Sequence, residues 1–123
     1  MKHYALILAT LLSLLIPVQS WSADFQKGLD AYKSGDYATA LEEWKPLAEQ
    51  GDENAQFFLG VMYYQSRGVT QDYKKAFKWY TLSAEQGNPE AQSSLGFIYY
   101  WGLGAPQDYE EALKWYSLSA KQG

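Results

Sequence analysis

The chain has 123 residues, a net charge of −4 and no cysteine, a size suited to one small domain or a short repeat array. Acidic residues outnumber basic ones by 14 to 10, which excludes nucleic acid as a partner, because phosphate binding needs clustered Lys and Arg. Without cysteine there are no disulfides and no lipid-modified cysteine, so packing, helped by an aromatic content of 17%, must hold the fold together.

Residues 1–22 show the order of segments that is typical of a secretory signal peptide. Lys2 lies in a polar start, residues 5–16 are apolar except for two hydroxyl side chains, and Pro17 is followed by small residues. This run is shorter than the roughly 20 residues that span a bilayer, so a cleaved signal is favoured over an uncleaved membrane anchor. We expect cleavage after Ser22 or at the next bond and a periplasmic or secreted mature protein, which contacts the membrane only through this segment before cleavage.

Residues 23–123 form a repeat domain. When the chain is shifted by 36 residues, 52–87 align with 88–123 at 19 identical positions. An earlier unit, 24–51, aligns after a four-residue deletion in the loop that carries Gly68 in the second unit. Self-similarity with this period is typical of stacked helix pairs. We therefore predict an all-α fold, an α-solenoid of antiparallel helix pairs made of these three units.

Residues suited to capping helices recur at equivalent places in the units. Candidate N-caps are Asp52 and Asn88 before a first helix, and Asp36, Asp72 and Asp108 before a second helix. Pro89 suits the first helical position, and Asp108 with Glu111 matches a capping box. Gly51 and Gly87 stand where a left-handed residue ends a helix. Each unit is therefore expected to contain two well-delimited helices.

Gly60 and Gly96 lie in the middle of the first helices, where glycine costs roughly 1 kcal/mol relative to alanine. A close approach of the partner helix explains this cost, and we expect Ala76 and Ala112 to lie opposite. The periodic aromatic residues of the second helices are interpreted as packing between helices: Trp79, Tyr80, Trp115 and Tyr116.

The second and third units share a string of residues in the same register: Ala55, Leu59, Gly60, Tyr63, Gly68, Asp72, Ala76, Trp79, Tyr80, Ala84 and Gly87, each repeated 36 positions later. This string resembles the Sel-one-like repeat family, a relative of the tetratricopeptide repeat with a longer loop. The resemblance implies a right-handed solenoid with a concave face, and adaptor proteins that assemble other proteins, often in the bacterial envelope. A few cysteine-rich members have been linked to β-lactam binding or hydrolysis, and the lack of cysteine here argues against that activity.

The first unit departs from the family pattern. Its loop is short, and Glu43-Trp44 stands where the second unit has Trp79-Tyr80. It is more similar to an ordinary tetratricopeptide pair, and we interpret it as an N-terminal cap.

The residue inventory argues against catalysis. The only histidine, His3, belongs to the signal segment, so the mature chain cannot form a Ser-His-Asp or Cys-His arrangement or a Cys/His zinc site. The adjacent pairs Glu42-Glu43 and Glu110-Glu111 do not face one another on a helix and are interpreted as solvated positions. We expect no enzyme activity, no metal and no cofactor.

In the tetratricopeptide pattern, first-helix positions beside the packed stripe line the concave face. By this pattern the partner-binding candidates are Phe25 and Tyr32 in the first unit, Phe57, Val61 and Tyr64 in the second, and Phe97, Tyr100 and Trp101 in the third, with Leu29 and Ser93 on the same face. The alternative is that these side chains pack against neighbouring units. Trp101 aligns with Gln65, so the repeat itself does not require a tryptophan there.

Two functions from different classes follow. The first is a protein–protein interaction module or scaffold that holds a protein or peptide partner. The second is binding of an exopolysaccharide or cell-wall glycan through exposed aromatic rings. Hydrolysis of a cell-wall or β-lactam substrate is a third, less favoured reading. The last helix lacks a polar cap after it, and solenoids need capped ends, so we also expect either further repeats or self-association through this C-terminal helix.

Overall fold

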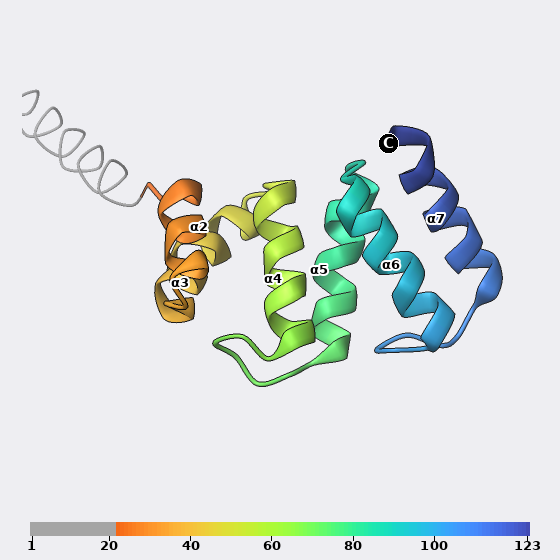
Figure 1. Ribbon diagram of the computed structural model, residues 1–123, viewed down its shortest axis with the longest axis horizontal. Helices are drawn as coiled ribbons and strands as arrows, with labels where there is room; N and C mark the ends of the chain where they lie inside the picture. The colour runs from red at the N-terminus through yellow and green to blue at the C-terminus, as the bar shows by residue number, and fades with distance from the viewer. Residues whose placement is uncertain (1–21) are drawn as a thin grey trace, which may run out of the picture.

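The computed structural model describes residues 22–123, which form six helices in three antiparallel pairs, without a strand among them (Figure 1). The pairs are α2 (Phe25–Lys33) with α3 (Tyr37–Glu49), α4 (Glu53–Gln65) with α5 (Tyr73–Glu85), and α6 (Pro89–Trp101) with α7 (Tyr109–Gln122). This confirms the predicted all-α solenoid. The expected signal segment lies outside the described residues.

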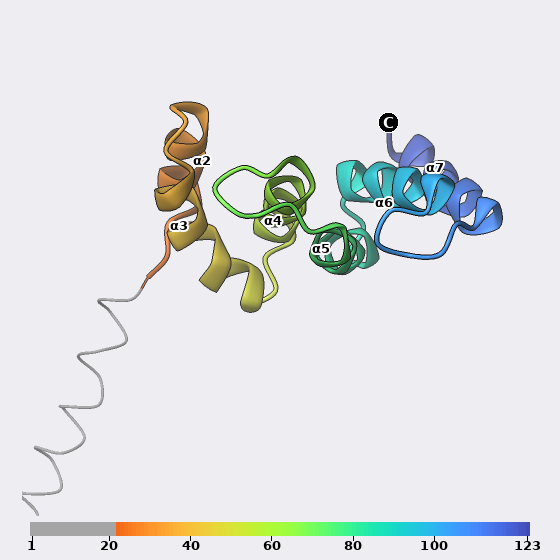
Figure 2. The ribbon, with the colours of Figure 1, turned by 90° about the horizontal axis from the view of Figure 1, so that it is seen from below.

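The helices stack in chain order, and the main helix contacts join neighbours in the sequence. Seen from below, α4 and α6 lie on one side of the array and α5 on the other (Figure 2). Such a stack buries its core between successive units, as in other solenoid proteins. Within residues 22–123, none of the helices combines the length and the apolar character needed to cross a membrane.

The predicted N-caps are confirmed. The side chains of Asp36, Asp52, Asp72, Asn88 and Asp108 all accept hydrogen bonds from backbone N–H groups in the first turn of the following helix. The left-handed glycines are confirmed as well, with φ of 101° at Gly51 and 99° at Gly87.

The capping box at the start of α7 forms only in part. Asp108 accepts from the backbone N–H of Glu111 at 3.1 Å. The Glu111 carboxylate accepts instead from the indole N–H of Trp115, also at 3.1 Å. The indole lies one turn further along the helix and takes the place of the backbone N–H that the capping box would have used.

The mid-helix glycines bring a ring of the second helix onto the backbone of the first. A Cβ added at Gly60 would lie 2.6 Å from the Tyr80 ring, and one added at Gly96 would lie 3.1 Å from the Tyr116 ring. The predicted close approach is therefore confirmed. The expectation that Ala76 lies opposite Gly60 is wrong, because the nearest group there is the Tyr80 ring. At Gly96 the ring is joined by the backbone oxygen of Ala112, at 3.2 Å. A bare glycine backbone offers a flat surface for the face of a ring, which an opposing alanine methyl would not fill.

Buried glutamines link each unit to the next. Gln56 donates to the carbonyl of Ala48 at 3.1 Å and accepts from Gln86 at 2.8 Å. Gln92 and Gln122 repeat these bonds between the second and third units. Among residues 22–123 every buried side-chain nitrogen or oxygen has a hydrogen-bond partner. The repeated Ala-Gln and Gln-Gly pairs of the sequence thus form a polar ladder along the array.

The long loop of each later unit folds back onto the unit before it. A Cβ added at Gly68, where φ is 74°, would lie 2.6 Å from Cβ of Tyr37 at the start of α3. Gly104, where φ is 78°, lies in the same way against the backbone of Tyr73 at the start of α5. Only glycine allows this close approach at a positive φ. The loop therefore belongs to the contact between units.

Candidate functional site

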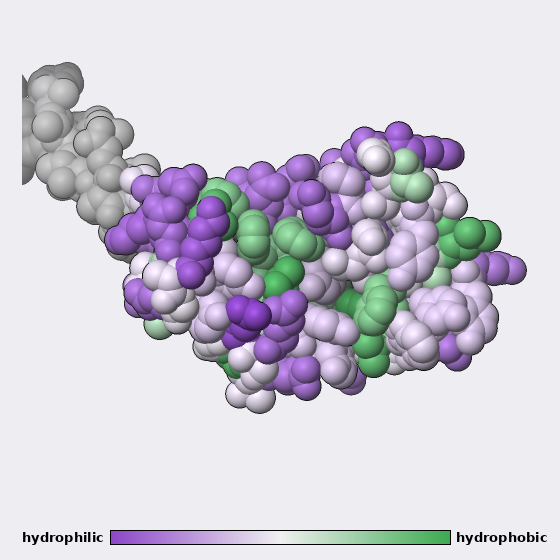
Figure 3. Space-filling view, in the orientation of Figure 1, coloured by the Kyte–Doolittle hydropathy of each residue, from purple (hydrophilic) through white to green (hydrophobic). Residues whose placement is uncertain are grey.

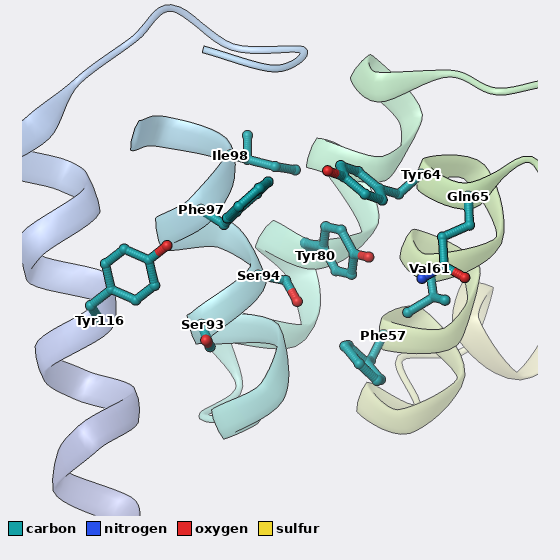
Figure 4. Close-up of a pocket in the computed structure, with 10 residues that line it drawn as sticks. All are labelled: Phe57, Val61, Tyr64, Gln65, Tyr80, Ser93, Ser94, Phe97, Ile98 and Tyr116. Carbon is teal, nitrogen blue, oxygen red and sulfur yellow. The ribbon is translucent and has the colours of Figure 1, made fainter. Parts of the chain in front are cut away.

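A hollow of about 410 Å³ opens between α4 and α6. We call it the α4–α6 groove, and ten residues line it (Figure 4): Phe57, Val61, Tyr64, Gln65, Tyr80, Ser93, Ser94, Phe97, Ile98 and Tyr116.

The groove has two walls and a floor. Phe57, Val61 and Tyr64 project from α4, and Phe97 projects from α6 on the opposite wall (Figure 4). Between them lies Tyr80 of α5, which is 4% exposed. The same Tyr80 ring rests on Gly60, so the contact that joins α4 to α5 also forms the bottom of the groove. Hydrophobic side chains gather over this part of the molecular surface (Figure 3).

The groove is neutral. None of its ten lining side chains is charged, and its polar groups are hydroxyls and one amide. Burial raises the pKa of Tyr80 above its ordinary value, and it also raises the pKa values of Tyr64 and Tyr116. These hydroxyls therefore stay protonated at neutral pH and can donate hydrogen bonds. The arrangement suits an uncharged ligand with apolar side chains and some hydrogen-bonding groups, since an unpaired charge would lose its solvation there.

A line of exposed rings continues from the groove along the C-terminal end of α6 to the start of α7. We call Phe97, Tyr100, Trp101 and Tyr109 the aromatic ridge; their exposed fractions are 39%, 43%, 59% and 60%. The ring centroid of Trp101 lies 6.3 Å from that of Phe97 and 5.0 Å from that of Tyr100, which in turn lies 5.2 Å from that of Tyr109. Rings held against one another lose little conformational freedom on binding, and such residues are enriched at binding surfaces.

The structure brings most of the predicted partner-binding residues together. Phe57, Val61, Tyr64 and Phe97 line the α4–α6 groove, and Tyr100 and Trp101 belong to the ridge beside it.

The two candidates of the first unit lie elsewhere. Phe25 and Tyr32 are half-buried against Trp44. The Phe25 ring stacks on Trp44 with centroids 5.7 Å apart, and the Tyr32 ring lies tilted to it at 5.5 Å. They pack against the core formed with Phe58, the arrangement that the sequence left open as an alternative to binding.

Sequence reasoning missed part of the groove. It assigned Tyr80 and Tyr116 to packing alone and did not consider Ser94 or Ile98. The signal that could have found them is the pair of mid-helix glycines, since Gly60 and Gly96 mark where the two tyrosine rings meet the first helices. Within the described part of the chain, no three His, Cys, Asp or Glu side chains are grouped so that they could hold a metal ion.

The comparisons with known proteins agree with this architecture. The family model described as the Sel1 repeat matches residues 54–88 and 89–123, which together make up more than half of the chain. The chain belongs to the Sel1 repeat family. Members of this family are generally protein-interaction modules, and their fold is typically a non-catalytic scaffold. The two matched Sel1 repeats cover the helix pairs that form the groove.

Two solved structures with Sel1 repeats are similar to the chain. One is a protective antigen present in uropathogenic Escherichia coli strains that displays an SLR fold, with 40% identity over 80% of this chain and a TM-score of 0.76. The other is a Sel1 repeat protein from Oxalobacter formigenes, with 31% identity over 71% of this chain and a TM-score of 0.69. The chain spans 22% of the first relative's length and 66% of the second's. No curated protein matches the chain.

Proposed function

We propose that this chain is an exported interaction module that holds an extended, uncharged stretch of a partner protein in the α4–α6 groove. The observation that carries the proposal is a neutral groove that continues into the exposed aromatic ridge. The aromatic walls would take apolar side chains of the partner, and the hydroxyls of Tyr64, Tyr80 and Ser94 would meet its backbone. Trp101, the most exposed ring of α6, would act as an anchor at one end.

Crosslinking tests the proposal: residues 22–123 are added to an envelope extract, and the partner that they capture is identified. Once the partner is identified, overlapping peptides from it are titrated onto the protein by fluorescence anisotropy. Combining Phe97→Ala with Trp101→Ala should weaken binding by about tenfold or more, because two exposed anchors are removed while the core stays intact. Leu82→Ala is the matched control, since Leu82 is 37% exposed on α5 and does not line the groove. A peptide that binds the double variant as tightly as the unaltered protein would refute the assignment of this surface.

Glycan binding is the second candidate, and the exposure of Trp101 favours it. This side chain is 59% exposed with Tyr100 beside it, and flat aromatic surfaces of this kind stack on sugar rings. Tryptophan fluorescence during titration with cell-wall and exopolysaccharide fragments separates the two functions. A saturable emission shift that disappears in Trp101→Phe would support glycan binding. No response to any of the glycans would favour binding of a protein partner instead.

Hydrolysis has weaker support, since neither the groove nor the ridge contains an activated nucleophile beside a base. Turnover of a chromogenic β-lactam or of a cell-wall substrate by the purified protein would overturn this view.

Export is proposed from the order of segments in residues 1–22. The similar protein of uropathogenic Escherichia coli is a protective antigen, which is compatible with an envelope location for this chain. Cell fractionation with N-terminal sequencing tests the proposal. The expected result is a periplasmic or secreted form that begins after Ser22 or Ala23, and an intact N-terminus in the membrane fraction would argue for an anchor instead.

A further inference from the structure

One side of α7 carries an apolar stripe that no described helix covers. We call Tyr109, Ala112, Leu113, Tyr116 and Ala120 the α7 end face. Leu113 is 69% exposed, Tyr109 60% and Tyr116 37%. A small hydrophobic (green) area lies at the right-hand edge of the molecule, at the end where α7 lies (Figure 3). Four of these five side chains are exposed along one helix, with only Ala112 buried.

The same stripe occurs twice more in the chain, 36 and 72 residues earlier, and is covered both times. The α5 copy is Tyr73, Ala76, Phe77, Tyr80 and Ala84, and the α3 copy is Tyr37, Ala40, Leu41, Trp44 and Ala48. Tyr80 is 4% exposed and Ala84 1%, whereas their α7 counterparts are both exposed. The tyrosine and the alanine are the same residue types in α5 and α7, so their unequal exposure reflects the neighbour of each helix and not the helix itself.

The first helix of the following unit covers the α5 stripe, and the contacts are specific. Leu95 packs into the same cluster as Ala84, and the Tyr99 ring lies edge-on to Phe77 with centroids 5.5 Å apart. Gln92 donates to the carbonyl of Ala84 at 3.3 Å. The loop at Gly104 then closes over the N-terminal end of α5.

The helix α4 covers the α3 stripe in the same way. Leu59 and Met62 pack with Trp44, Gln56 donates to Ala48, and the loop at Gly68 closes over α3. The two internal contacts define what a covering helix needs. It carries the pattern of Ala91, Gln92, Leu95, Ile98 and Tyr99, with methionine also allowed in the place of Ile98. A glycine follows five residues after the tyrosine.

We propose that the α7 end face binds the first helix and following loop of a Sel1-type unit carried by another polypeptide. The partner's leucine and isoleucine would cover Leu113 and Tyr116, and its glutamine would donate to the carbonyl of Ala120. The partner's loop glycine would close over Tyr109. The contact would continue the interface that already joins α3 to α4 and α5 to α6. The α7 end face shares Tyr116 with the α4–α6 groove and Tyr109 with the aromatic ridge. Leu113 belongs to neither, so a change at Leu113 distinguishes this contact from binding in the groove.

The first helix of a second copy does not fit this face. In α2, Lys27 and Asp30 occupy the places of Leu95 and Ile98. Lys27 forms an ion pair with Glu43 at 3.2 Å. Docking α2 on Leu113 would bring the charges of Lys27 and Asp30 out of water and onto an apolar side chain, which is unfavourable. The α2 helix is thus charged at the places where the covering helices α4 and α6 are apolar.

A labelled peptide spanning residues 88–107, with the sequence of α6 and its loop, serves as the probe. A lactam bridge between Ser93→Lys and Phe97→Glu, both exposed positions of α6, holds the peptide helical, since short isolated helices are marginal in water. Fluorescence anisotropy with residues 22–123 should show saturable binding. The same peptide with Leu95→Glu should not bind, because this leucine is fully buried in the internal contact.

Variants of the protein locate the binding surface. Leu113→Glu should weaken peptide binding by about tenfold or more, because it places a charge in the covered stripe. Leu82→Glu, an exposed leucine of α5, and Trp101→Ala in the aromatic ridge should leave binding unchanged. Equal binding to Leu113→Glu, or no saturable binding, would overturn the proposal. So would a monomer–dimer equilibrium in sedimentation that Leu113→Glu abolishes, because the face would then be occupied by a second copy through α7, as the sequence alone predicted.

Discussion

Gly60→Ala adds a single methyl group where α4 rests on the ring of Tyr80. The new Cβ would lie 2.6 Å from two ring carbons, far inside the usual carbon–carbon contact of about 3.5–4.0 Å. The ring is 4% exposed and cannot move away without leaving the floor of the groove. Alanine favours the helix over glycine by about 1 kcal/mol, but overpacking of a core costs about 1–3 kcal/mol. We expect the free energy of unfolding to fall by up to about 2 kcal/mol.

The matched control is Gly96→Ala, at the same place in the next unit. Its Cβ would lie 3.1 Å from the Tyr116 ring and 3.2 Å from the backbone oxygen of Ala112, both longer than the 2.6 Å contact at Gly60. The Tyr116 ring is 37% exposed and can shift toward solvent. The gain in helix propensity should then offset the contact and leave the stability within about 0.5 kcal/mol of the unaltered protein. Urea unfolding of residues 22–123, monitored by far-UV circular dichroism, measures the stability of both variants. The comparison holds if the dependence of unfolding free energy on urea concentration is the same in both. If Gly60→Ala lost no stability, or Gly96→Ala lost more, contact with the ring would not explain why these positions are glycine.

Two further predictions concern the Tyr80 hydroxyl and the loop glycines. Burial raises the pKa of Tyr80 in the folded state, so its contribution to stability is complete below about pH 10 and is lost as the pH rises toward the folded-state pKa. Above that pH the unfolding free energy should fall less steeply in Tyr80→Phe than in the unaltered protein, by up to about 1.4 kcal/mol per pH unit. Tyr109→Phe, at an exposed position, is the control. Alkaline unfolding that is the same in both variants would contradict this prediction. Gly68→Ala should cost about twice as much stability as Gly87→Ala, roughly 1–2 kcal/mol for the latter, because both positions have positive φ but only Gly68 also meets Tyr37. Thermal unfolding of the two variants checks the order, and a larger loss for Gly87→Ala would show that the loop does not hold the units together.

Several local features could be predicted from the sequence because they depend on nearby residues. Asp52 and Asn88 cap helices through backbone groups three positions away, and Gly87 ends a helix through its own backbone conformation. The 36-residue period made the helix-pair solenoid predictable, since a repeated unit repeats its fold. Only half of the predicted capping box at Asp108 forms, because the Glu111 carboxylate accepts a hydrogen bond from the Trp115 indole and not from the backbone N–H of Asp108.

The candidate site was less predictable, because it depends on which side chains meet across units. Spacing identified Val61 and Phe97 as concave, but the floor of the groove required knowing that Tyr80 folds onto Gly60. The same spacing placed Phe25 beside them, although in the tertiary structure it stacks on Trp44.

The sequence by itself determined that residues 24–123 form repeated helix pairs with defined caps and an apolar stripe on each second helix. Only the tertiary structure decided which stripes are covered. Tyr80 and Tyr116 stand at the same place in helices of similar sequence, yet one is 4% and the other 37% exposed. A repeat encodes its own helices through local interactions, whereas burial is a property of whatever lies against them.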